Sequence, residues 1–368
     1  MDTTQIRWGI LSTAQIARKN WRAIRHSGNG IVAAVASRDP VRSQAFIDEC
    51  QLESPFESAP RALGSYEALI DSPEVDAIYV PLPTGLRKQW VIRAAQAGKH
   101  VVCEKPCGSN LRDLEEILEA CERYGVQFMD GVMFMHSKRL TAIRRVLEDR
   151  SIVGTIRRIQ TGFSFCAPPS FFSGNIRSNA SLEPHGCVGD LGWYCIRLTL
   201  WAMNWRMPTQ VTGRILSQVS RPDSPAPVPT EFSAELLYEN GVSAGFYCAF
   251  IAELQQWAIV SGDKGYLRIP DFVLPYYGGE MSFETHQAAY EVQGCEFQMK
   301  PGIDVHSVNE HSNSHPNAQE SNLFRNFASQ ILSGRLNHDW PEMALKTQKV
   351  LEACLESSRN ESQLIPLS

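Results

Sequence analysis

The first 130 residues alternate between short apolar runs and longer stretches in which apolar residues recur at helical spacing. The short runs are rich in β-branched residues and span residues 6–11, 31–37, 76–81, 100–103 and 126–130. The amphipathic stretches between them cover residues 14–26, 40–50, 86–96 and 111–124. Strands and helices in regular alternation predict βαβ units, and hence an α/β fold with a doubly wound parallel sheet covered by helices on both faces.

The pattern changes after about residue 136. Five runs alternate apolar and polar residues, which predicts strands over residues 155–166, 210–220, 231–238, 242–250 and 256–261. Helices are predicted over residues 138–149, 189–201, 321–333 and 341–356, and a long polar loop over residues 304–319. Strands of this kind are typical of antiparallel sheets with one face exposed to solvent or covered by a partner. We therefore expect two domains: a Rossmann domain over residues 1–130, and an α+β domain with a large, mostly antiparallel sheet over residues 131–368.

Composition narrows the classes of partner and location. The length of 368 residues suits two domains, and the formal net charge of −5 is spread along the chain. Nucleic-acid and anionic-membrane surfaces need concentrated Lys and Arg, so neither partner is expected. The opening residues lack a secretory signal, and no apolar run is long enough to span a membrane. The ten cysteines include no Cys-x2-Cys pair, so we expect no metal site, reduced thiols and a cytoplasmic location.

A tight turn follows the first predicted strand, at the place where doubly wound folds bind a dinucleotide pyrophosphate. It reads Gly9-Ile-Leu-Ser12-Thr13-Ala14-Gln15-Ile16-Ala17. Small residues stand at positions 12, 14 and 17, where the usual G-x-G-x-x-G/A fingerprint requires close approach of the backbone. Gly9 and the five residues from Ser12 to Ile16 are therefore candidate cofactor contacts, although a tight turn in any α/β protein could have the same sequence.

The second predicted strand ends Ala36-Ser37-Arg38-Asp39-Pro40, where a dinucleotide site contacts the adenosine ribose. Asp39 directly precedes a proline at a predicted helix start, so its carboxylate is expected to cap that helix. Ser37 and Arg38 remain to face the ribose, and a guanidinium suits a 2′-phosphate. The expected cofactor is therefore NADP, with NAD also possible because Arg38 could instead be a surface residue that covers the adenine.

Three further segments, taken in order, carry a resemblance to a known family. They read Val75-Asp-Ala-Ile-Tyr-Val-Pro81-Leu82-Pro83-Thr84, then Ala97-Gly-Lys-His-Val-Val-Cys-Glu104-Lys105-Pro106, and then Gly189-Asp190-Leu-Gly-Trp-Tyr194. Together they resemble the Gfo/Idh/MocA oxidoreductase family over nearly the whole chain. The Asp-x-x-x-Tyr spacing is similar to the subgroup of dimeric dihydrodiol dehydrogenases, glucose–fructose oxidoreductase and NADP-dependent xylose dehydrogenases.

This resemblance implies an enzyme that transfers a hydride between a nicotinamide and a CH–OH carbon of a sugar or related polyhydroxy compound. It implies further cofactor contacts, namely Pro81, Leu82, Pro83, Glu104 and Pro106. Lys105 is then expected to hydrogen-bond both the reacting hydroxyl and the nicotinamide ribose. The resemblance also implies that the open sheet of the second domain forms the substrate floor and a dimer surface, so a homodimer or a dimer of dimers is expected.

The chemistry of hydride transfer gives the same residues their roles. A hydride that leaves or reaches a carbinol carbon requires a proton to leave or reach its oxygen, so the site needs a positioned acid–base group. Lys105 follows a buried strand at its C-terminal end, where doubly wound folds bind ligands. Asp190 and Tyr194 are four residues apart on a predicted helix and so share a face. We expect Lys105 and Tyr194 to handle the proton, with Asp190 orienting the substrate or Lys105.

Three other residues are candidates with open alternatives. The family loop that usually reads Asn-x-x-His is Thr84-Gly-Leu-Arg87 here, so Arg87 either replaces a cofactor contact or simply starts a helix. His136 ends the segment Val132-Met-Phe-Met-His136 and is equally open to a substrate contact and to a structural role. Arg177 lies in a loop before the Asp190 helix and could reach a substrate oxygen.

A second function remains open from the sequence: an inactive NADP-binding sensor of the same fold that regulates a protein partner. A pure sensor has no need to hold Lys105, Asp190 and Tyr194 in one cluster. An intact set of these three residues therefore favours the enzyme, and the absorbance of the reduced cofactor with a panel of aldoses, keto-sugars and dihydrodiols would separate the two hypotheses.

Overall fold

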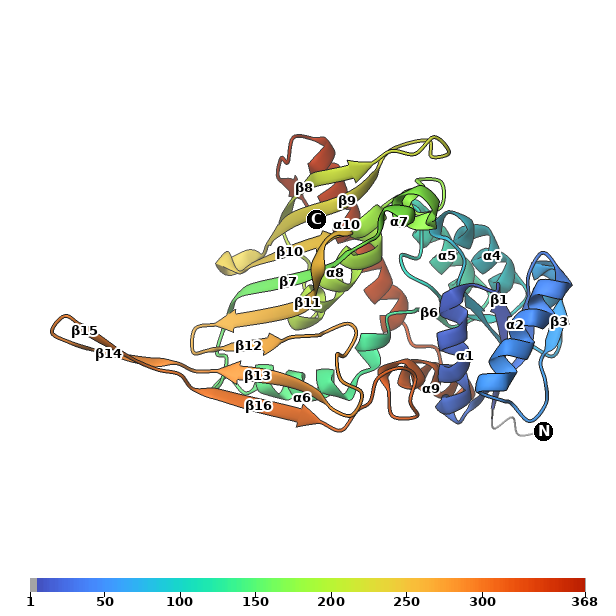
Figure 1. Cartoon of the computed structure of the whole chain (residues 1–368), viewed down its shortest axis with the longest axis horizontal. Coiled ribbons are helices and arrows are strands. Elements are labelled where there is room, and N and C mark those ends of the chain that lie inside the picture. Colours follow the sequence, from blue (N-terminus) through green and yellow to red (C-terminus); the bar gives the residue numbers. More distant parts are fainter. Residues whose placement is uncertain (1–4, 368) are drawn as a thin grey trace.

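Two large sheets organise the chain in the computed structural model, which describes residues 5–367 (Figure 1). The first has six parallel strands in the order β3-β2-β1-β4-β5-β6. Its strands are β1 (Ile6–Leu11), β2 (Gly30–Ala36), β3 (Arg61–Leu63), β4 (Ala77–Val80), β5 (His100–Cys103) and β6 (Phe128–Asp130). Its helices are α1 (Gln15–Ser27), α2 (Pro40–Glu53), α3 (Tyr66–Ile70), α4 (Thr84–Gln96) and α5 (Leu111–Arg123). The strand order reverses between β1 and β4, which is where open α/β sheets bind ligands.

The doubly wound parallel sheet predicted from the sequence is confirmed. The cap of α2 is also as predicted, because the carboxylate of Asp39 accepts a hydrogen bond of 2.9 Å from the backbone N–H of Val41. The pattern missed β3 and α3, which have three and five residues, because such short elements carry too few positions to show a period.

The second sheet has nine strands in the order β16-β13-β12-β11-β7-β10-β9-β8-β17. They are β7 (Ile156–Cys166), β8 (Gln210–Val219), β9 (Val228–Leu237), β10 (Ser243–Ala249), β11 (Ile251–Gly262), β12 (Tyr266–Ile269), β13 (Met281–His286), β16 (Ile303–Val308) and β17 (Ile365–Pro366). Neighbouring strands run antiparallel except β7 and β10, which pair in parallel. The predicted large and mostly antiparallel sheet is therefore confirmed. The predicted loop over residues 304–319 is wrong in its first part, because residues up to 308 pair with β13 as β16.

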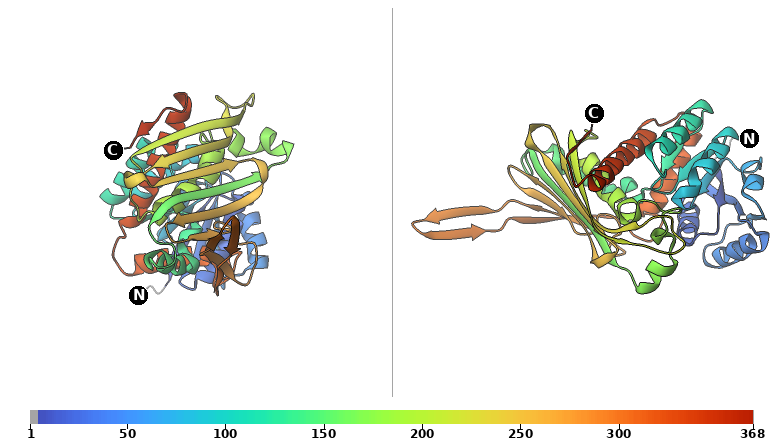
Figure 2. Two further views of the ribbon diagram at one scale, coloured as in Figure 1. Left: turned by 90° about the vertical axis from the view of Figure 1, so that its left-hand side faces the viewer. Right: turned by 90° about the horizontal axis from the view of Figure 1, so that it is seen from above.

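In the part of the chain that the structure describes, helices cover only one face of this second sheet. α6 (Lys138–Glu148), α8 (Trp193–Ala202) and α10 (Asp339–Arg359) pack on that face, and a short helix α7 (Pro169–Gly174) lies in the loop after β7. Figure 2 shows the opposite face with no helix over it. We call it the open face of the sheet. Among residues 5–367, no helix is both long and apolar enough to cross a membrane.

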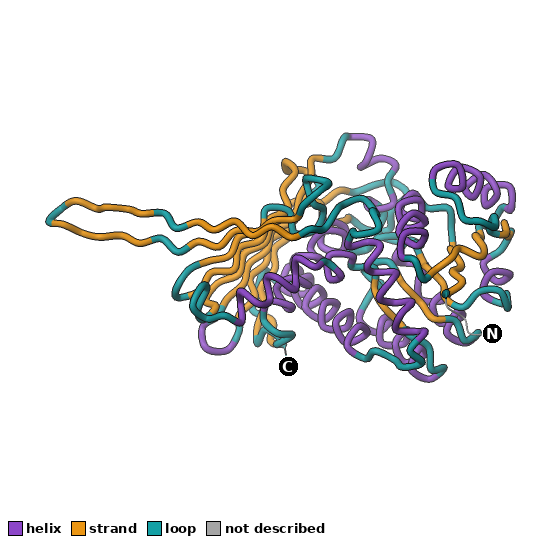
Figure 3. The backbone as a smooth tube through the Cα atoms, turned by 90° about the horizontal axis from the view of Figure 1, so that it is seen from below, coloured by secondary structure: helices purple, strands orange, loops and turns teal. Residues whose placement is uncertain are grey.

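A two-stranded ribbon leaves the sheet between β13 and β16. It consists of β14 (Ala289–Gln293) and β15 (Glu296–Lys300), which pair antiparallel and extend well beyond the rest of the molecule (Figures 1 and 3). Every residue of both strands is exposed. We call this ribbon the β14–β15 arm.

One helix from the C-terminal part packs on the first sheet. α9 (Gln319–Leu332) lies against α1 and places Phe324 and Phe327 on Trp8 of β1, with ring centroids 5.1 and 5.5 Å apart. Phe324 also meets the ring of Tyr79 in β4 at 5.7 Å. α9 therefore completes the core on one face of the parallel sheet. In the sequence it is separated from β6 by nearly all strands of the second sheet.

Candidate active site

A cleft of about 880 Å³ lies where the C-terminal ends of β1, β4 and β5 meet α8 and the second sheet. Eleven residues singled out from the sequence line it, namely Ala14, Gln15, Ile16, Pro81, Leu82, Arg87, Glu104, Lys105, Arg177, Asp190 and Tyr194. Eight others do not line it, namely Gly9, Ser12, Thr13, Ser37, Arg38, Pro83, Pro106 and His136. The cleft thus joins the predicted cofactor turn to the predicted catalytic residues.

Lys105 and Asp190 form an ion pair inside this cleft. Lys105 follows β5 directly, and its peptide bond to Pro106 is cis. Its Nζ donates to the Asp190 carboxylate at 2.8 Å and to the Asp190 backbone carbonyl at 2.5 Å. The lysine side chain is only 8% exposed, so the ion pair is shielded from solvent. Two acceptors therefore fix the direction of the ammonium group within the cleft.

Arg177 joins the same carboxylate from the other side. Its Nε lies 2.7 Å from Asp190 Oδ2, while Lys105 holds Oδ1. Burial opposes ionisation of Asp190, but the charges and hydrogen bonds of Arg177 and Lys105 outweigh it and lower the pKa of this carboxyl to about 2. Asp190 is therefore ionised at neutral pH and holds two cations at once.

Tyr194 lies beneath this ion pair. The Lys105 ammonium is 4.5 Å from the centre of its ring, within the range of a cation–π contact. The Tyr194 hydroxyl is 3.8 Å from the sulfur of Met133. Burial and the negative charges of Glu104 and Asp190 raise the pKa of the Tyr194 phenol well above its ordinary value, so the protein groups alone keep it protonated.

The segment that carries Asp190 is wound more loosely than the sequence predicts. Residues Val188–Gly192 form a π-helical turn, and the α-helix α8 begins only at Trp193. A π turn inside a helix is frequent at functional sites because the extra residue re-aims the side chains around it. Asp190 and Tyr194 both line the cleft, as their spacing of four predicted. Asp190 lies in the π turn, however, and Tyr194 in the α-helix that follows it.

The start of α1 offers unpaired backbone amides to the cleft. Its N-cap residue Ala14 provides no side-chain cap, and its first turn contains no acidic residue. The backbone N–H groups of Gln15 and Ile16 have no acceptor among residues 5–367. Ser12 turns the chain at a φ of 140° and accepts a hydrogen bond from Ala14 N at 3.2 Å. Free amides at a helix N-terminus are the donors that a pyrophosphate needs, so this turn fits a dinucleotide.

Gly9 serves packing within the strand. A Cβ on this residue would lie 3.0 Å from Leu69 and 3.0 Å from Val75, so a larger residue would require these side chains to shift. Gly9 is therefore packed as a residue of an α/β core. This fits the alternative interpretation of the turn, in which any α/β protein could have the same sequence.

Two arginines lie near the predicted ribose position, Arg38 after β2 and Arg42 in the first turn of α2. Ser37 is buried and bonded to the Asp39 backbone, whereas Arg38 is exposed. The charges of Arg38 and Arg42 both act on the phenol of Tyr66, where they partly offset the rise in its pKa caused by burial. Arg42 was missed from the sequence, although its spacing of four from Arg38 at a helix start could have indicated it.

Arg87 is bound by the protein itself. Its Nε donates to the carbonyl of Leu82 at 2.7 Å, and its Nη1 donates to Thr84 Oγ1 at 3.0 Å and to the carbonyl of Pro106. Glu183 closes this cluster by accepting from Thr84 Oγ1 at 2.5 Å and from Thr84 N at 3.1 Å. Arg87 thus connects the Pro81–Pro83 loop to the loop after β5. It lines the cleft, but its hydrogen bonds hold these two loops together.

Glu104 is anchored by a buried tyrosine. Tyr79 Oη donates to Glu104 Oε1 at 2.6 Å and accepts from Asn20 Nδ2 at 2.5 Å. Burial first, and then the charge of Glu104, raise the pKa of Tyr79 well above its ordinary value. This chain links α1, β4 and the residue before Lys105, and so fixes the backbone that presents the lysine.

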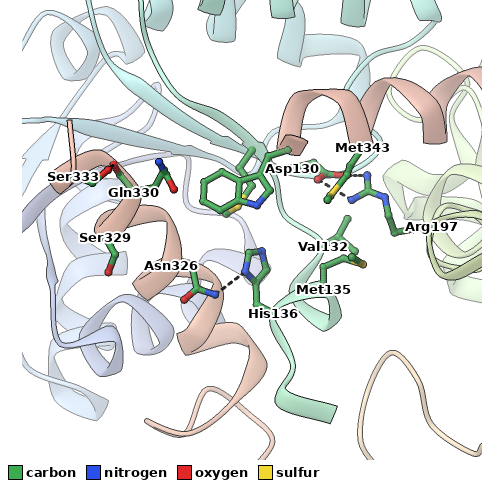
Figure 4. Close-up of a pocket in the computed structure, with 12 residues that line it drawn as sticks. Asp130, Val132, Met135, His136, Arg197, Asn326, Ser329, Gln330, Ser333 and Met343 are labelled. Atoms are coloured by element: carbon green, nitrogen blue, oxygen red, sulfur yellow. Dashed lines mark hydrogen bonds and ion pairs between the residues drawn. The ribbon is translucent and has the colours of Figure 1, made fainter. Parts of the chain in front are cut away.

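His136 lies in a different cavity (Figure 4). This cavity of about 470 Å³ is bounded by α9, α10 and the 3₁₀ turn Met133–His136. Asn326 lies 3.1 Å from His136 Nδ1, and burial lowers the pKa of the imidazole to about 4. The substrate contact considered for His136 is therefore not supported by its position, which fits the structural alternative.

Eight apolar residues that were not predicted also line the cleft, together with Lys19, Gly174, Asn175 and Glu183. The eight are Met133, Phe163, Phe165, Ile176, Leu191, Leu254, Val273 and Leu274. These residues come from β7, β11 and loops far apart in sequence, so their convergence depends on the pairing of the second sheet. Among residues 5–367, no group of three or more His, Cys, Asp or Glu side chains is placed to hold a metal ion.

Comparison with protein families gives two adjoining matches. Residues 6–132 match the oxidoreductase family GFO/IDH/MocA with its NAD-binding Rossmann fold, and residues 140–268 match the GFO/IDH/MocA C-terminal domain. The D-xylose 1-dehydrogenase (NADP(+)) 2 of Haloferax volcanii is 31% identical over 76% of this chain and 80% of that protein. The trans-1,2-dihydrobenzene-1,2-diol dehydrogenase of Mus musculus is 29% identical over 73% of this chain and 76% of that protein.

Solved structures share the fold. An aldose-aldose oxidoreductase from Caulobacter crescentus, complexed with glycerol, has a TM-score of 0.80 at 23% identity and covers 99% of this chain and 100% of its own. A 3-ketoreductase from Actinomadura kijaniata, in complex with NADP and TDP-benzene, has a TM-score of 0.77 at 23% identity over 96% and 97% of the two chains.

Proposed function

Because the chain belongs to the GFO/IDH/MocA oxidoreductase family, with an NAD-binding Rossmann fold in its first part, we propose that its cleft transfers a hydride between NADP and a CH–OH carbon of a sugar or related polyhydroxy compound. The observation that carries this proposal is the cluster of Lys105, Asp190, Arg177 and Tyr194 in the same cleft as the free amides of α1. A sensor without catalysis would have no use for this cluster, and no contact in it favours that alternative.

The roles of the residues follow from their contacts. The nicotinamide, when bound, supplies or accepts the hydride. The Lys105 ammonium stabilises the substrate oxygen as its charge changes, since it is held in a shielded cleft where such interactions are strong. Tyr194 passes the proton to or from that oxygen, and Asp190 is the positioning residue that aims both Lys105 and Arg177. Arg177 contacts a further substrate oxygen from its place at the rim.

The preference for NADP rests on the two arginines after β2. Arg38 is exposed and pairs with no carboxylate among residues 5–367, since the neighbouring Asp39 caps α2 instead. Arg38 and Arg42 together provide the positive charge that a 2′-phosphate requires. The xylose dehydrogenase relative is named for NADP, which supports the same cofactor here.

The substrate is constrained by the two halves of the cleft. The charged cluster offers donors to hydroxyl and carbonyl oxygens, whereas Phe163, Phe165 and Leu254 face them with an apolar wall. A polyhydroxy compound with one apolar edge fits such a cleft, because polar groups fix orientation while apolar surface adds affinity. The names of the relatives, an aldose dehydrogenase and a dihydrodiol dehydrogenase, support this class.

The same proposal extends to the domains and their assembly. Residues 1–130 bind the cofactor, and residues 131–368 bind substrate on the helix-covered face of the nine-stranded sheet. The open face then pairs with a second copy in a homodimer or a dimer of dimers. Two ion pairs lie within the face, Arg158 with Glu235 and Arg268 with Glu284, so covering the face leaves these four charges paired.

Replacing the lysine tests the chemistry. Lys105→Ala should retain NADPH binding, measured by fluorescence titration, and lose hydride transfer by about 100-fold to 10,000-fold, the range expected for a positioned acid–base group. The readout is nicotinamide absorbance with a panel of aldoses, keto-sugars and dihydrodiols. Lys264→Ala, at an exposed turn, is the control and should match the unmodified protein. Equal turnover by Lys105→Ala and the unmodified protein would remove Lys105 from the mechanism, and no turnover of any substrate by the unmodified protein would favour the sensor.

A further inference from the structure

The β14–β15 arm has one apolar face and one polar face. Its strands pair Tyr290 with Met299 and Val292 with Phe297, so these four side chains lie on the same side of the ribbon. They are exposed by 66%, 67%, 52% and 71%, respectively. The opposite side carries only small, polar or charged residues, namely Ala289, Glu291, Gln293, Glu296, Gln298 and Lys300.

The apolar face of the arm continues the open face of the nine-stranded sheet. β13 pairs with β16 in a register that the arm keeps without a shift, because Gln287 N also bonds to the carbonyl of Gly302 at 2.8 Å between them. Side chains alternate along a strand, so Ile303 and Val305 on β16 share a side with Phe297 and Met299 on β15. Ile303 and Val305 are themselves 56% and 66% exposed. An apolar stripe therefore runs from the sheet into the arm.

This chain does not cover that stripe itself. In Figure 2 the sheet is seen on its open face, and the arm points away from it, from the helices and from the first sheet. An isolated two-stranded ribbon is at best marginally stable in water, and an apolar edge of this kind invites association. The arm therefore requires a covering surface from another molecule.

The length of the arm fits a second copy of this chain as that molecule. Residues 287–293 extended as a strand span about 23 Å, whereas two sheets stacked face to face lie about 10 Å apart. A second copy seated on the open face would therefore have the arm alongside its sheet and its helical layer. The two-fold symmetry of such a pair makes the contact reciprocal, with each copy holding the other.

We propose that the β14–β15 arm is a clasp that packs on a second copy of this chain. Its contact surface is the apolar face formed by Tyr290, Val292, Phe297 and Met299. This inference rests on the homodimer proposed above and assigns a separate, removable part of its interface. The open face supplies the broad contact, centred on residues such as Trp257 and Ile259 of β11, and the arm adds an apolar grip at its edge.

Two lysine substitutions on opposite sides of the arm test the clasp. Phe297→Lys places a positive charge on the apolar face of the arm. Gln298→Lys places the same charge on the next residue, which lies on the polar face. Sedimentation velocity over a wide range of protein concentration gives the dimer dissociation constant. We expect Phe297→Lys to raise it by about 30-fold or more, the effect of losing a buried aromatic anchor, and Gln298→Lys to leave it near that of the unmodified protein.

The outcomes separate the clasp from the dimer and from the enzyme. Circular dichroism spectra should match for both variants, because the arm lies outside both cores. An unchanged dissociation constant for Phe297→Lys would overturn the clasp, and Ile259→Lys on the sheet would then show whether the open face alone forms the dimer. An unmodified protein that stays monomeric at every concentration would overturn clasp and dimer together. Hydride transfer, measured separately, tests the proposed reaction in either case.

Discussion

Asp190 is the residue on which the charges of the cleft converge. Its two oxygens hold Lys105 and Arg177, and its low pKa keeps it ionised over the whole physiological range. One carboxylate against two cations leaves the cluster with a net positive charge. Such a cluster stabilises an oxygen that gains negative charge as a hydride leaves or arrives at the neighbouring carbon.

Arg38 should decide between the two nicotinamide cofactors. Arg38→Ala removes a guanidinium that is exposed after β2 and free to meet a 2′-phosphate. Losing one charge-assisted hydrogen bond of about 1.5–3 kcal/mol corresponds to a rise of about 10-fold to 100-fold in KM for NADPH. KM for NADH, measured in the same preparation, should change little and serves as the internal control. A parallel rise for both cofactors would show that Arg38 contacts the adenine instead.

His185 should make the fold sensitive to acid. It is buried, its Nδ1 has no hydrogen-bond partner among residues 5–367, and burial lowers its pKa to about 4. The unfolded chain binds the proton more readily, so the stability contributed by neutral His185 is full above its unfolded pKa and is lost as pH falls toward 4. At pH 5 this loss is about 2 kcal/mol relative to pH 7.

The comparison of two histidine variants measures this effect. His185→Leu should reduce the drop in unfolding free energy between pH 7 and pH 5, determined by urea denaturation, by about that amount. His338→Leu, at an exposed position, should keep the full drop. Equal drops in the two variants would mean that His185 is protonated in the folded protein.

At the scale of elements, the π-helical turn Val188–Gly192 brings Asp190 to the loop after β5. Gly189 makes this approach possible, because a Cβ there would lie 2.8 Å from His185 Cβ and 3.1 Å from Pro106 Cγ. Any side chain at this position must push the turn away from the Lys105-Pro106 segment. The glycine therefore sets the distance between the two halves of the catalytic cluster.

Gly189→Ala should consequently lower both stability and turnover. We expect a loss of about 1–3 kcal/mol of unfolding free energy from overpacking, and a fall in kcat with little change in KM for NADPH. Gly192→Ala, in the same turn, meets no atom closer than 3.4 Å and is the matched control. If both variants unfold at the same denaturant concentration and turn over equally, the close packing around Gly189 does not set the geometry of the site.

Long regular elements were predictable from the sequence, and short or irregular ones were not. Five of the six strands of the first sheet were predictable as apolar runs, and α9 and α10 from their helical period. β12 has only four residues, and β14 and β15 alternate around an exposed apolar face that resembles that of a core strand. The π turn has no sequence signature, because its extra residue is defined by backbone hydrogen bonds. Lys105, Asp190 and Tyr194 were predictable from ordered segments. The pairing of Arg177 with Asp190 depends on the path of the irregular segment between β7 and α8, and that of Glu183 with Thr84 on how the second part of the chain docks on the first.

At the scale of the whole molecule, helices from the C-terminal part of the chain pack on the first sheet and so join the two parts. α9 and α10 come late in the chain, yet α9 covers the first sheet and α10 packs on α5 and β6 as well as on β8. The cleft lies at this junction, so the same contacts that join the parts also align the cofactor turn with Lys105 and Asp190. The β14–β15 arm, in contrast, packs on neither part among residues 5–367, and every residue of its two strands is exposed.

The late position of α9 also has a consequence for synthesis on the ribosome. Trp8 and Tyr79 emerge early, but Phe324, which covers both, follows β6 by about 190 residues, or about 10–40 s at ordinary rates of translation. During that interval α1 and α2 cover only part of this face of the first sheet, and the part over Trp8 and Tyr79 lacks the helix that completes its core. The nascent protein should therefore depend on chaperones until its last tenth or so has been made, and a chain truncated before α9 should aggregate even though all six strands of the first sheet are present.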